Sequence, residues 1–329
     1  MTIELLDSLK KGGFVIGTAL IVFVAARNSI TWHLVNVWGA SGDFWQTIWE
    51  KVYDAVNGDP VLLGVIGTFV VSFTFFWLFN IGFVLLDIFG PPESIRRFKV
   101  QQDKNVPIDP YRFRSALKMV LFNQTIVSVP FLIVTQYIMR LRGGNFSREL
   151  PTLSTVVWEL FLFSLVEEIG FYYTHRLFHH PRLYKYVHKM HHEFTATISI
   201  VSLYSHPLEH IVSNLSPVTV GPILLGSHVA TCWLWLIIAL ASITVAHCGY
   251  HMPLLPSPEA HDWHHLTFTN NFGTLGILDR LHGTDEAFRR SKQYQRHFLL
   301  LSLIPVNHTV PDADKKLSYD DDDKNFVEI

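Results

Sequence analysis

Long stretches without a charged residue constrain this chain most. Val61–Leu86 holds 26 uncharged residues, and Met119–Met139 holds another 21. At 1.5 Å per residue, a helix over the first stretch is roughly 39 Å long, which exceeds the ~30 Å hydrocarbon core of a bilayer. Pro130 lies inside the second stretch, at a position that a membrane helix tolerates. Both stretches therefore predict membrane-spanning helices.

Two further apolar segments are less clear. Gly12–Ala26 is followed by a charge and by no evident cleavage site, so it predicts a membrane anchor that spans or lies at the interface. Leu153–Tyr173 carries Glu159, Glu167 and Glu168. Acidic residues at membrane depth are costly without a partner, so the last two are either functional or solvated at the membrane surface.

A fifth apolar region, Ile211–Ala246, is interrupted at Gly221-Pro222 and again at Gly226-Ser227-His228. Its arms of about 15 and 17 residues are each short for a full span. We expect a helical hairpin that enters and leaves the membrane on one side. Residues before and after the hairpin then lie on the same side.

The charge distribution orients the predicted helices and excludes some partners. A net charge of −2 with only 16% charged residues argues against nucleic acid binding and for a membrane protein. Positive residues concentrate between the first two long stretches and should be cytosolic, which also places the residues after Thr174 in the cytosol. These residues are Arg96, Arg97, Lys99, Lys104, Arg112, Arg114 and Lys118.

Histidine is the unusual residue here, with 18 copies. Ten of them form four short spacings in which two or three imidazoles share one helical face. Neutral imidazole binds Fe, Zn, Cu and Ni, and ten rings exceed one coordination shell, so two metal ions are expected. The proposed ligands are His175, His179, His188, His191, His192, His247, His251, His261, His264 and His265.

Other polar residues are expected to orient the ring N–H groups of these ligands, as metal-bound histidines usually require. The candidates are His206, His210, Glu167, Glu168, Glu209, Asp262 and His282. No Glu-x-x-His pair, the mark of carboxylate-bridged di-iron bundles, occurs at the clusters. The two cysteines, Cys232 and Cys248, lack the spacing of a thiolate cluster.

The order HRLFHH (175–180), HKMHHEF (188–194), HCGYH (247–251) and HDWHH (261–265) resembles the fatty acid hydroxylase/sterol desaturase superfamily. The likeness covers Leu153 to Asp285, and its last part is similar to relatives of sterol C4-methyl oxidases. In those oxidases the position of His251 is often not histidine, whereas hydroxylases have His-x3-His there.

This resemblance implies an all-α, multi-span enzyme of the endoplasmic reticulum membrane with a cytosolic, histidine-rich di-metal cap. It implies a lipid monooxygenase with two Fe ions (Zn being possible in preparations) and O2 as oxidant, with electrons from NAD(P)H through cytochrome b5 or a similar donor. The chain has no GxGxxG fingerprint, so the electrons must come from a separate protein. The expected substrate is a sterol.

Three alternatives remain open: a fatty acyl or sphingolipid hydroxylase or desaturase, a metal transporter or zinc sensor, and a non-catalytic metal-binding membrane regulator. The expected organisation is a membrane and basic segment over 1–150, a catalytic domain over 151–310 and a polar acidic tail over 311–329.

Overall fold

The computed structural model describes residue 39 and residues 42–311 of the chain. The described part is helical and contains no β-strand, only two isolated bridges. The expected all-α membrane fold is confirmed. The predicted segment Gly12–Ala26 and most of the acidic tail lie outside the described residues.

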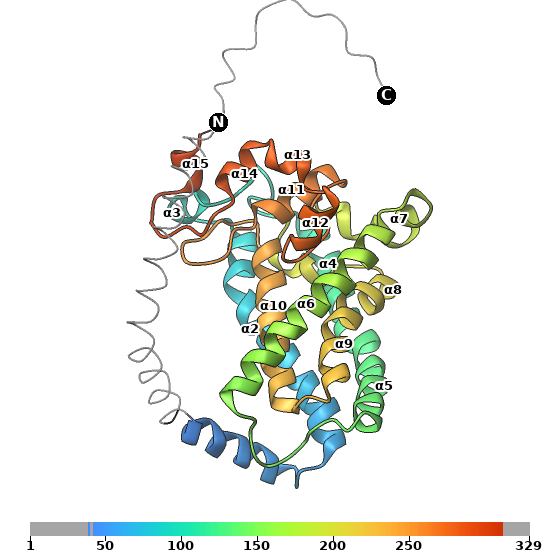
Figure 1. Ribbon diagram of the computed structural model, residues 1–329. Coiled ribbons are helices and arrows are strands. Elements are labelled where there is room, and N and C mark those ends of the chain that lie inside the picture. The colour runs from blue at the N-terminus through green and yellow to red at the C-terminus, as the bar shows by residue number, and fades with distance from the viewer. Residues whose placement is uncertain (1–38, 40–41, 312–329) are drawn as a thin grey trace, which may run out of the picture.

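Six long helices form a bundle with a cap of short helices at one end (Figure 1). The bundle consists of α2 (Thr68–Phe89), α4 (Pro110–Phe122), α5 (Ser128–Leu141), α6 (Leu153–Phe178), α9 (Ser216–Leu225) and α10 (Val229–His247). The cap consists of α3 (Glu93–Arg96), α7 (Pro181–Val187), α8 (Pro207–Glu209), α11 (Glu259–Thr267), α12 (Ile277–His282), α13 (Glu286–Arg289), α14 (Lys292–Arg296) and α15 (Val306–Thr309), together with short 3₁₀ turns at His191–Glu193 and Ser199–Leu203.

Three helical stretches of the described chain are long and apolar enough to cross a membrane: Leu62–Phe89, Pro110–Leu141 and Val229–His247. The first two confirm the spans predicted from the uncharged runs. Each contains a π-helical segment, Leu62–Gly67 before α2 and Asn123–Val127 between α4 and α5. Pro130 lies just inside α5, where the helix continues without a break.

The predicted hairpin is present, but the expectation that both of its arms are too short was wrong. It descends through a π-helical segment, His210–Leu215, and α9, and it returns through α10. α10 has 19 residues and qualifies as a span. The tip of the hairpin contacts the loop after α5, where His228 Nε2 lies 3.1 Å from the Ser147 carbonyl oxygen.

Close backbone packing joins α6 to α9. A Cβ atom at Gly221 would lie 2.9 Å from Cδ1 of Phe163, and one at Gly170 would lie 3.1 Å from Cβ of Pro217. Residues without a Cβ are therefore required for this close approach. α6 has 26 residues, and its Glu167 and Glu168 are buried, so these acids are not solvated at the surface.

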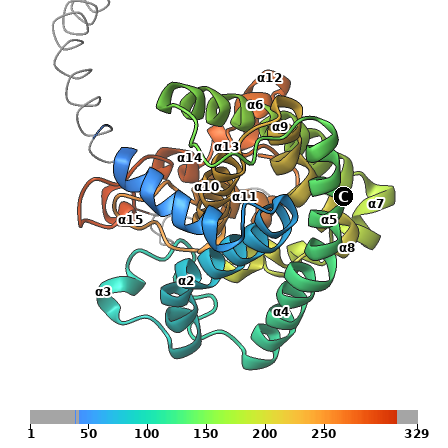
Figure 2. The ribbon, with the colours of Figure 1, turned by 90° about the horizontal axis from the view of Figure 1, so that it is seen from below.

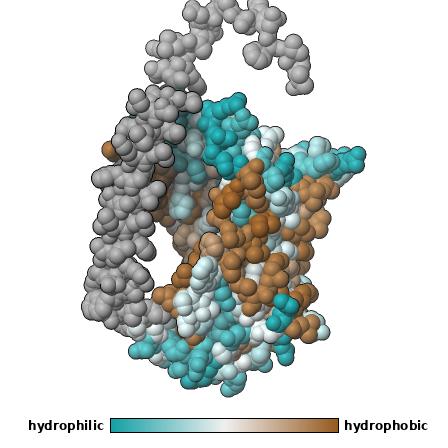
Figure 3. Space-filling view, viewed as in Figure 1, coloured by the Kyte–Doolittle hydropathy of each residue, from teal (hydrophilic) through white to brown (hydrophobic). Residues whose placement is uncertain are grey.

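The two ends of the bundle are polar and the middle of the visible face is apolar (Figure 3). At the end away from the cap, the helix formed by residues 42–55 lies across the bundle (Figures 1 and 2). Arg148 lies there and pairs with Glu50 at 3.0 Å and with Asp54 at 2.9 Å. The basic segment after α2 lies at the opposite end, where Arg112 donates to the Glu193 carbonyl oxygen at 2.7 Å.

Candidate metal centre

Nine of the ten predicted ligand histidines converge at the cap end of the bundle, in two groups. The five-histidine group contains His175 at the end of α6, His179 just after it, His188, His192, and His264 on α11. The four-histidine group contains His191, His247, His261 and His265. Within each group the candidate ligand nitrogens all lie within 4.8 Å of one another.

The two groups are adjacent. The rings of His192 and His265, one from each group, have centroids 4.7 Å apart. The histidine pairs 191/192 and 264/265 each contribute one ring to each group, because neighbouring side chains on a helical turn point in different directions. The adjacent positions of these histidines in the sequence therefore place one ring of each pair in each group.

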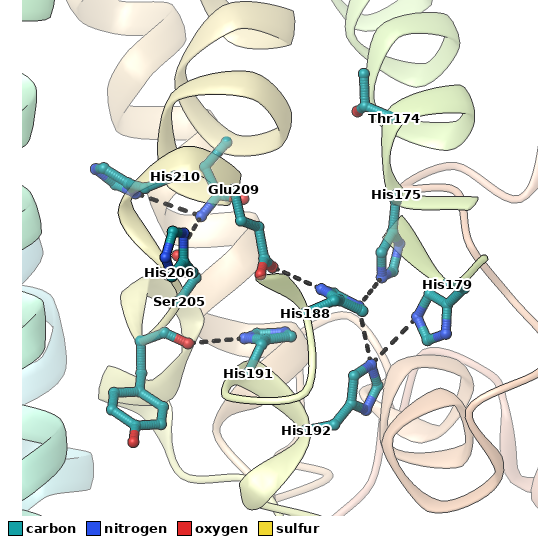
Figure 4. A network of polar contacts seen from close by, with 12 residues as sticks. Thr174, His175, His179, His188, His191, His192, Ser205, His206, Glu209 and His210 are labelled. Carbon is teal, nitrogen blue, oxygen red and sulfur yellow. Dashed lines mark hydrogen bonds and ion pairs between the residues drawn. The ribbon is translucent and has the colours of Figure 1, made fainter. Parts of the chain in front are cut away.

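Hydrogen bonds at Nδ1 fix the tautomer of several rings. His188 donates from Nδ1 to Glu209 at 2.8 Å, and His175 donates to the Phe272 carbonyl oxygen at 2.8 Å (the former is drawn in Figure 4). An oxygen acceptor requires an N–H at Nδ1, so Nε2 of both neutral rings carries a lone pair. Nevertheless these two Nε2 atoms lie only 3.1 Å apart.

The four-histidine group repeats this arrangement. His191 donates from Nδ1 to the Tyr204 carbonyl oxygen at 3.0 Å, and His247 donates to the Ile243 carbonyl oxygen at 2.7 Å. Their Nε2 atoms lie 3.4 Å apart. Two bare nitrogens at such distances repel each other unless a positive charge lies between them. The donor set therefore fits a metal ion in each group, with imidazole ligands throughout.

Burial keeps these rings neutral. Desolvation lowers the pKa of His191 to about 4, and it lowers the pKa of His179 to about 2 together with the charge of neighbouring rings. The pKa values of His261, His264 and His265 are also lowered, first by burial and then by adjacent imidazoles. Neutral imidazole is the form that binds a metal, so the site does not need to lose protons near pH 7.

A loop after α11 holds two of the rings and is itself held by acids. The Asn270 carbonyl oxygen accepts from Nδ1 of His264 at 2.6 Å, and the Phe272 carbonyl oxygen binds His175 as described above. Asp279 accepts from the backbone N–H groups of Phe272 and Gly273 at 2.8 and 2.7 Å. The sequence did not indicate Asp279 as a site residue. Asp279 fixes the loop whose backbone carbonyls hold the histidine rings, and it contacts no ring itself.

Glu168 stabilises the same loop. It accepts from the backbone N–H groups of Thr274, Leu275 and Leu278 at 2.8, 2.7 and 3.0 Å. It contacts no histidine ring directly, contrary to the role expected for it. A carboxylate that accepts several backbone N–H groups fixes the conformation of a loop strongly.

His251, the tenth predicted ligand, does not join either group. Its Nε2 lies 2.9 Å from the Phe298 carbonyl oxygen, and its Nδ1 lies 3.5 Å from a carboxylate oxygen of Glu259. The side chain is fully buried at 0% exposure. His251 therefore links the start of α11 to the segment before α15, away from the metal-binding nitrogens.

The remaining candidates fall in different places. Asp262 accepts from Gln101 at 3.0 Å, and His282 stacks on Tyr172 and lies 3.0 Å from the Tyr173 hydroxyl. Neither makes a hydrogen bond with a ligand ring in the described part of the chain.

The histidines and the remaining acid near α8 also differ in role. His206 accepts from the backbone N–H of Leu208 as the N-cap of α8, and His210 lies 3.0 Å from the Ser128 hydroxyl (Figure 4 shows both histidines beside Glu209). Glu167 makes no hydrogen bond with any described residue. Of the acids expected to orient a ligand ring, Glu209 is the one that does so.

A cavity of about 180 Å³ connects the metal centre to the membrane part of the bundle. At one end it is lined by His175, His188, His191, His247 and His261. Its remaining wall is mostly apolar and comes from the long helices, with Phe73 of α2, Phe131 of α5, Ile223 of α9 and Leu236 of α10. The arrangement can hold an apolar molecule with one part beside both histidine groups.

Comparisons with known proteins agree with this geometry. The family model described as fatty acid hydroxylase matches residues 160–284. Fatty acid hydroxylase domain-containing protein 2 from Homo sapiens is 46% identical over 94% of this chain and 93% of its own length. Methylsterol monooxygenase 2-2 from Arabidopsis thaliana is 31% identical over 70% of this chain and 88% of its own length.

A third relative is named for a different activity. Very-long-chain aldehyde decarbonylase GL1-11 from Oryza sativa subsp. japonica is 31% identical over 70% of this chain and 88% of its own length. No solved structure matches the chain. The family resemblance seen in the histidine motifs is confirmed.

Proposed function

Because the chain belongs to the fatty acid hydroxylase family and is thus a membrane-bound oxidoreductase that acts on lipids, we propose that it is a di-iron, oxygen-dependent monooxygenase of a sterol. The observation that carries this proposal is the shared cavity. One apolar chamber inside the membrane part of the bundle ends at both histidine groups.

Iron would be held by the nine converging histidines, with His251 outside the set. When bound, two iron ions supply the capacity to use O2 for oxidising an unactivated C–H bond. The protein prepares the ligands for this. Glu209 and the carbonyl oxygens of Asn270, Phe272, Tyr204 and Ile243 hold the rings through Nδ1, so that Nε2 faces the centre.

The cavity wall positions the lipid and excludes water. Aromatic and aliphatic side chains such as Phe73, Phe131 and Leu236 favour a hydrocarbon skeleton over solvent. Held rigidly, the substrate presents the same carbon to the histidine groups in each binding event, which is the main contribution of positioning to rate. A dry chamber also limits side reactions of the oxidant with water.

A sterol is favoured over an acyl chain by the relationship to a methylsterol monooxygenase. The alternative is hydroxylation or desaturation of a fatty acyl chain or sphingolipid at the same site. It uses the same cavity and centre, so product analysis separates the two.

We also propose that electrons come from NAD(P)H through a cytochrome b5-type donor at the cytosolic face of the endoplasmic reticulum. The basic segment after α2 and the histidine centre lie at the same end of the bundle, as the contact of Arg112 with Glu193 illustrates. Positive residues favour the cytosolic side, and they attract an acidic donor. The exposed basic side chains of α7, Arg182 and Lys185, supply further positive charge near the centre.

The test begins with metal content. Protein purified gently should carry about two metal ions per chain by mass spectrometry, with iron able to support turnover. It is then supplied with a 4-methylsterol, O2, NAD(P)H, a reductase and cytochrome b5, and the products are analysed by mass spectrometry. An oxidised sterol that is absent under nitrogen and absent in His264→Ala supports the proposal. Oxidation of acyl lipids alone would establish the alternative, and metal-free folded protein would overturn the enzyme mechanism.

A further inference from the structure

One acidic side chain in the lipid cavity has no role in the metal centre. Glu167 lines the cavity from α6, about two helical turns before His175, and its side chain is 8% exposed. Among the described residues no hydrogen-bond or ion-pair partner is recorded for its carboxyl group. Its neighbour Glu168 points to the loop after α11 and is fully engaged there.

A carboxyl group without a partner in an apolar chamber destabilises the folded protein. Burial of such a group costs several kcal/mol unless a hydrogen bond compensates it, and acids at membrane depth usually mark a functional site. Several other polar side chains that line the cavity already have partners. Thr68 accepts from Trp233 at 2.9 Å, and Gln136 donates to the Pro60 carbonyl oxygen at 2.6 Å.

The charge of the cavity restricts what Glu167 can bind. The lining contains no lysine and no arginine among the described residues. A fatty acid anion or a phosphate headgroup beside Glu167 would therefore meet a carboxyl group and no basic side chain of the lining to neutralise it. Like charges in a water-poor site repel strongly, so anionic lipids are disfavoured.

A hydroxyl group suits this position, because it can donate to a carboxyl oxygen or accept from a protonated carboxyl. A second polar group of the cavity wall also lacks a partner among the described residues. Ser213, on the π-helical segment before α9, also lines the cavity, and its hydroxyl has no hydrogen-bond partner in the described part of the chain. Glu167 thus offers an oxygen-bearing lipid a polar group that the protein itself leaves unused, while the hydroxyl of Ser213 is enclosed within the cavity wall.

We propose that the cavity binds a neutral lipid alcohol whose hydroxyl group hydrogen-bonds the carboxyl of Glu167, and that it discriminates against lipids with an anionic head. The inference rests on the proposed function only in taking this cavity as the substrate site. It narrows the substrate class to lipid alcohols. The two kinds of lipid that carry such a hydroxyl group are sterols and long-chain alcohols.

Binding of labelled alcohols to the purified full-length protein tests this without electron donor or turnover. Tritiated cholesterol and tritiated hexadecanol are each bound in detergent, and they are displaced by cholestane, hexadecane or ionised hexadecanoate. We expect at least one labelled alcohol to bind, with the matching hydrocarbon and hexadecanoate about tenfold weaker as competitors. The alcohol that binds shows whether the hydroxyl group belongs to a sterol or to a long-chain alcohol.

Two variants on α6 make the test specific. Glu167→Leu should remove the preference for the alcohol over its hydrocarbon, while Glu167→Gln, which can still donate and accept, should keep most of it. Glu159→Leu is the matched control, since this residue lies on the same helix but does not line the cavity. It should leave the preference unchanged.

Three results would overturn the inference: neither alcohol binds, hexadecanoate competes as well as hexadecanol, or Glu167→Leu retains the wild-type preference. Ser213→Ala, paired with Ser216→Ala on the same helical arm, extends the comparison to the second polar group. Failure of the oxidation itself is a separate outcome. An alcohol that binds as expected but is never oxidised leaves this inference standing and contradicts the proposed monooxygenase activity.

Discussion

Glu209 Oε1 lies 2.8 Å from Nδ1 of His188, and both side chains are almost completely buried, at 4% and 1% exposure. This pair couples the start of the hairpin to the five-histidine group. A carboxylate on the far nitrogen of a ligand ring orients that ring and raises its basicity. The strength of metal binding should therefore depend on a residue that is not itself a ligand.

Replacing Glu209 with glutamine tests that dependence. Glu209→Gln keeps an acceptor of similar size but removes the charge, so we expect metal in the five-histidine group to bind about 10-fold more weakly. Chelator competition followed by metal mass spectrometry measures the change. Glu193→Gln is the control, because Glu193 accepts from the Tyr204 hydroxyl and has no recorded bond to a ring nitrogen. Equal metal retention in both variants would contradict the prediction.

The two histidine groups should lose metal independently. His264→Ala removes a ring from the five-histidine group and His191→Ala removes one from the four-histidine group, so each should lower the stoichiometry by about one ion and abolish turnover. His251→Ala should keep both ions, since this residue contacts Phe298 and Glu259 instead. Metal content per folded chain is the measurement. Loss of an ion in His251→Ala would show that His251 is a metal ligand after all.

Glu168→Gln should destabilise the loop that supports His175 and His264. Only one oxygen of the amide can accept, so bonds from Thr274, Leu275 or Leu278 are lost at a cost of about 1.5–3 kcal/mol each. We expect a lower melting temperature and faster metal release, while Glu149→Gln on the opposite end of the bundle has no effect. A melting temperature equal to that of the wild type would show that the loop does not depend on this carboxylate.

Filling the cavity should stop turnover without removing metal. Ala239 lines the chamber on α10, whereas its neighbour Ile238 is 42% exposed on the outer face of the bundle. Ala239→Phe should therefore lower lipid binding and turnover at least about tenfold, because a phenyl ring occupies the substrate volume. Ile238→Phe places the same ring outside. Lipid binding that survives in Ala239→Phe would mean that the substrate uses another site.

The metal-free protein should lose stability as the pH falls from about 6.5 to about 4. The pKa of His191 is lowered by burial to about 4, from an ordinary value of 6.5. In that window the unfolded state binds more protons than the folded state, so stability rises with pH and is lost on acidification. Thermal melting across this range measures it, with His191→Gln expected to show a shallower dependence. A melting temperature that rises on acidification would contradict the argument.

Much of the fold follows from patterns that the sequence displays directly. The uncharged runs locate α2 and the helix pair α4–α5, because a bilayer admits few other structures. The interruption at Gly226 locates the turn of the hairpin, whereas the interruption expected at Gly221-Pro222 was wrong, because α9 continues through both residues. The extent of α10 was underestimated, since the helix also includes His247, a polar residue that is buried beside the other histidines of its group.

The site was predictable in part for a similar reason. Histidines three and four residues apart fall on one helical face, so their spacing indicates convergence. His251 fits that spacing after His247, but the helix ends between them and Gly249 adopts a φ of 73°. The chain therefore turns His251 away. The backbone carbonyls of Asn270 and Phe272 hold the rings of His264 and His175. Because any residue type has a carbonyl group, the sequence does not indicate these contacts.

The order of the ligands along the chain has a consequence for biogenesis. His175, His179, His188 and His192 precede the hairpin, so four of the five rings of one group leave the ribosome before it. The other group has only His191 at that stage and waits for His247, His261 and His265. Insertion of the hairpin thus separates the synthesis of the two groups. A nascent chain arrested before α11 holds four of the five rings of the five-histidine group, whereas the four-histidine group still lacks His261 and His265.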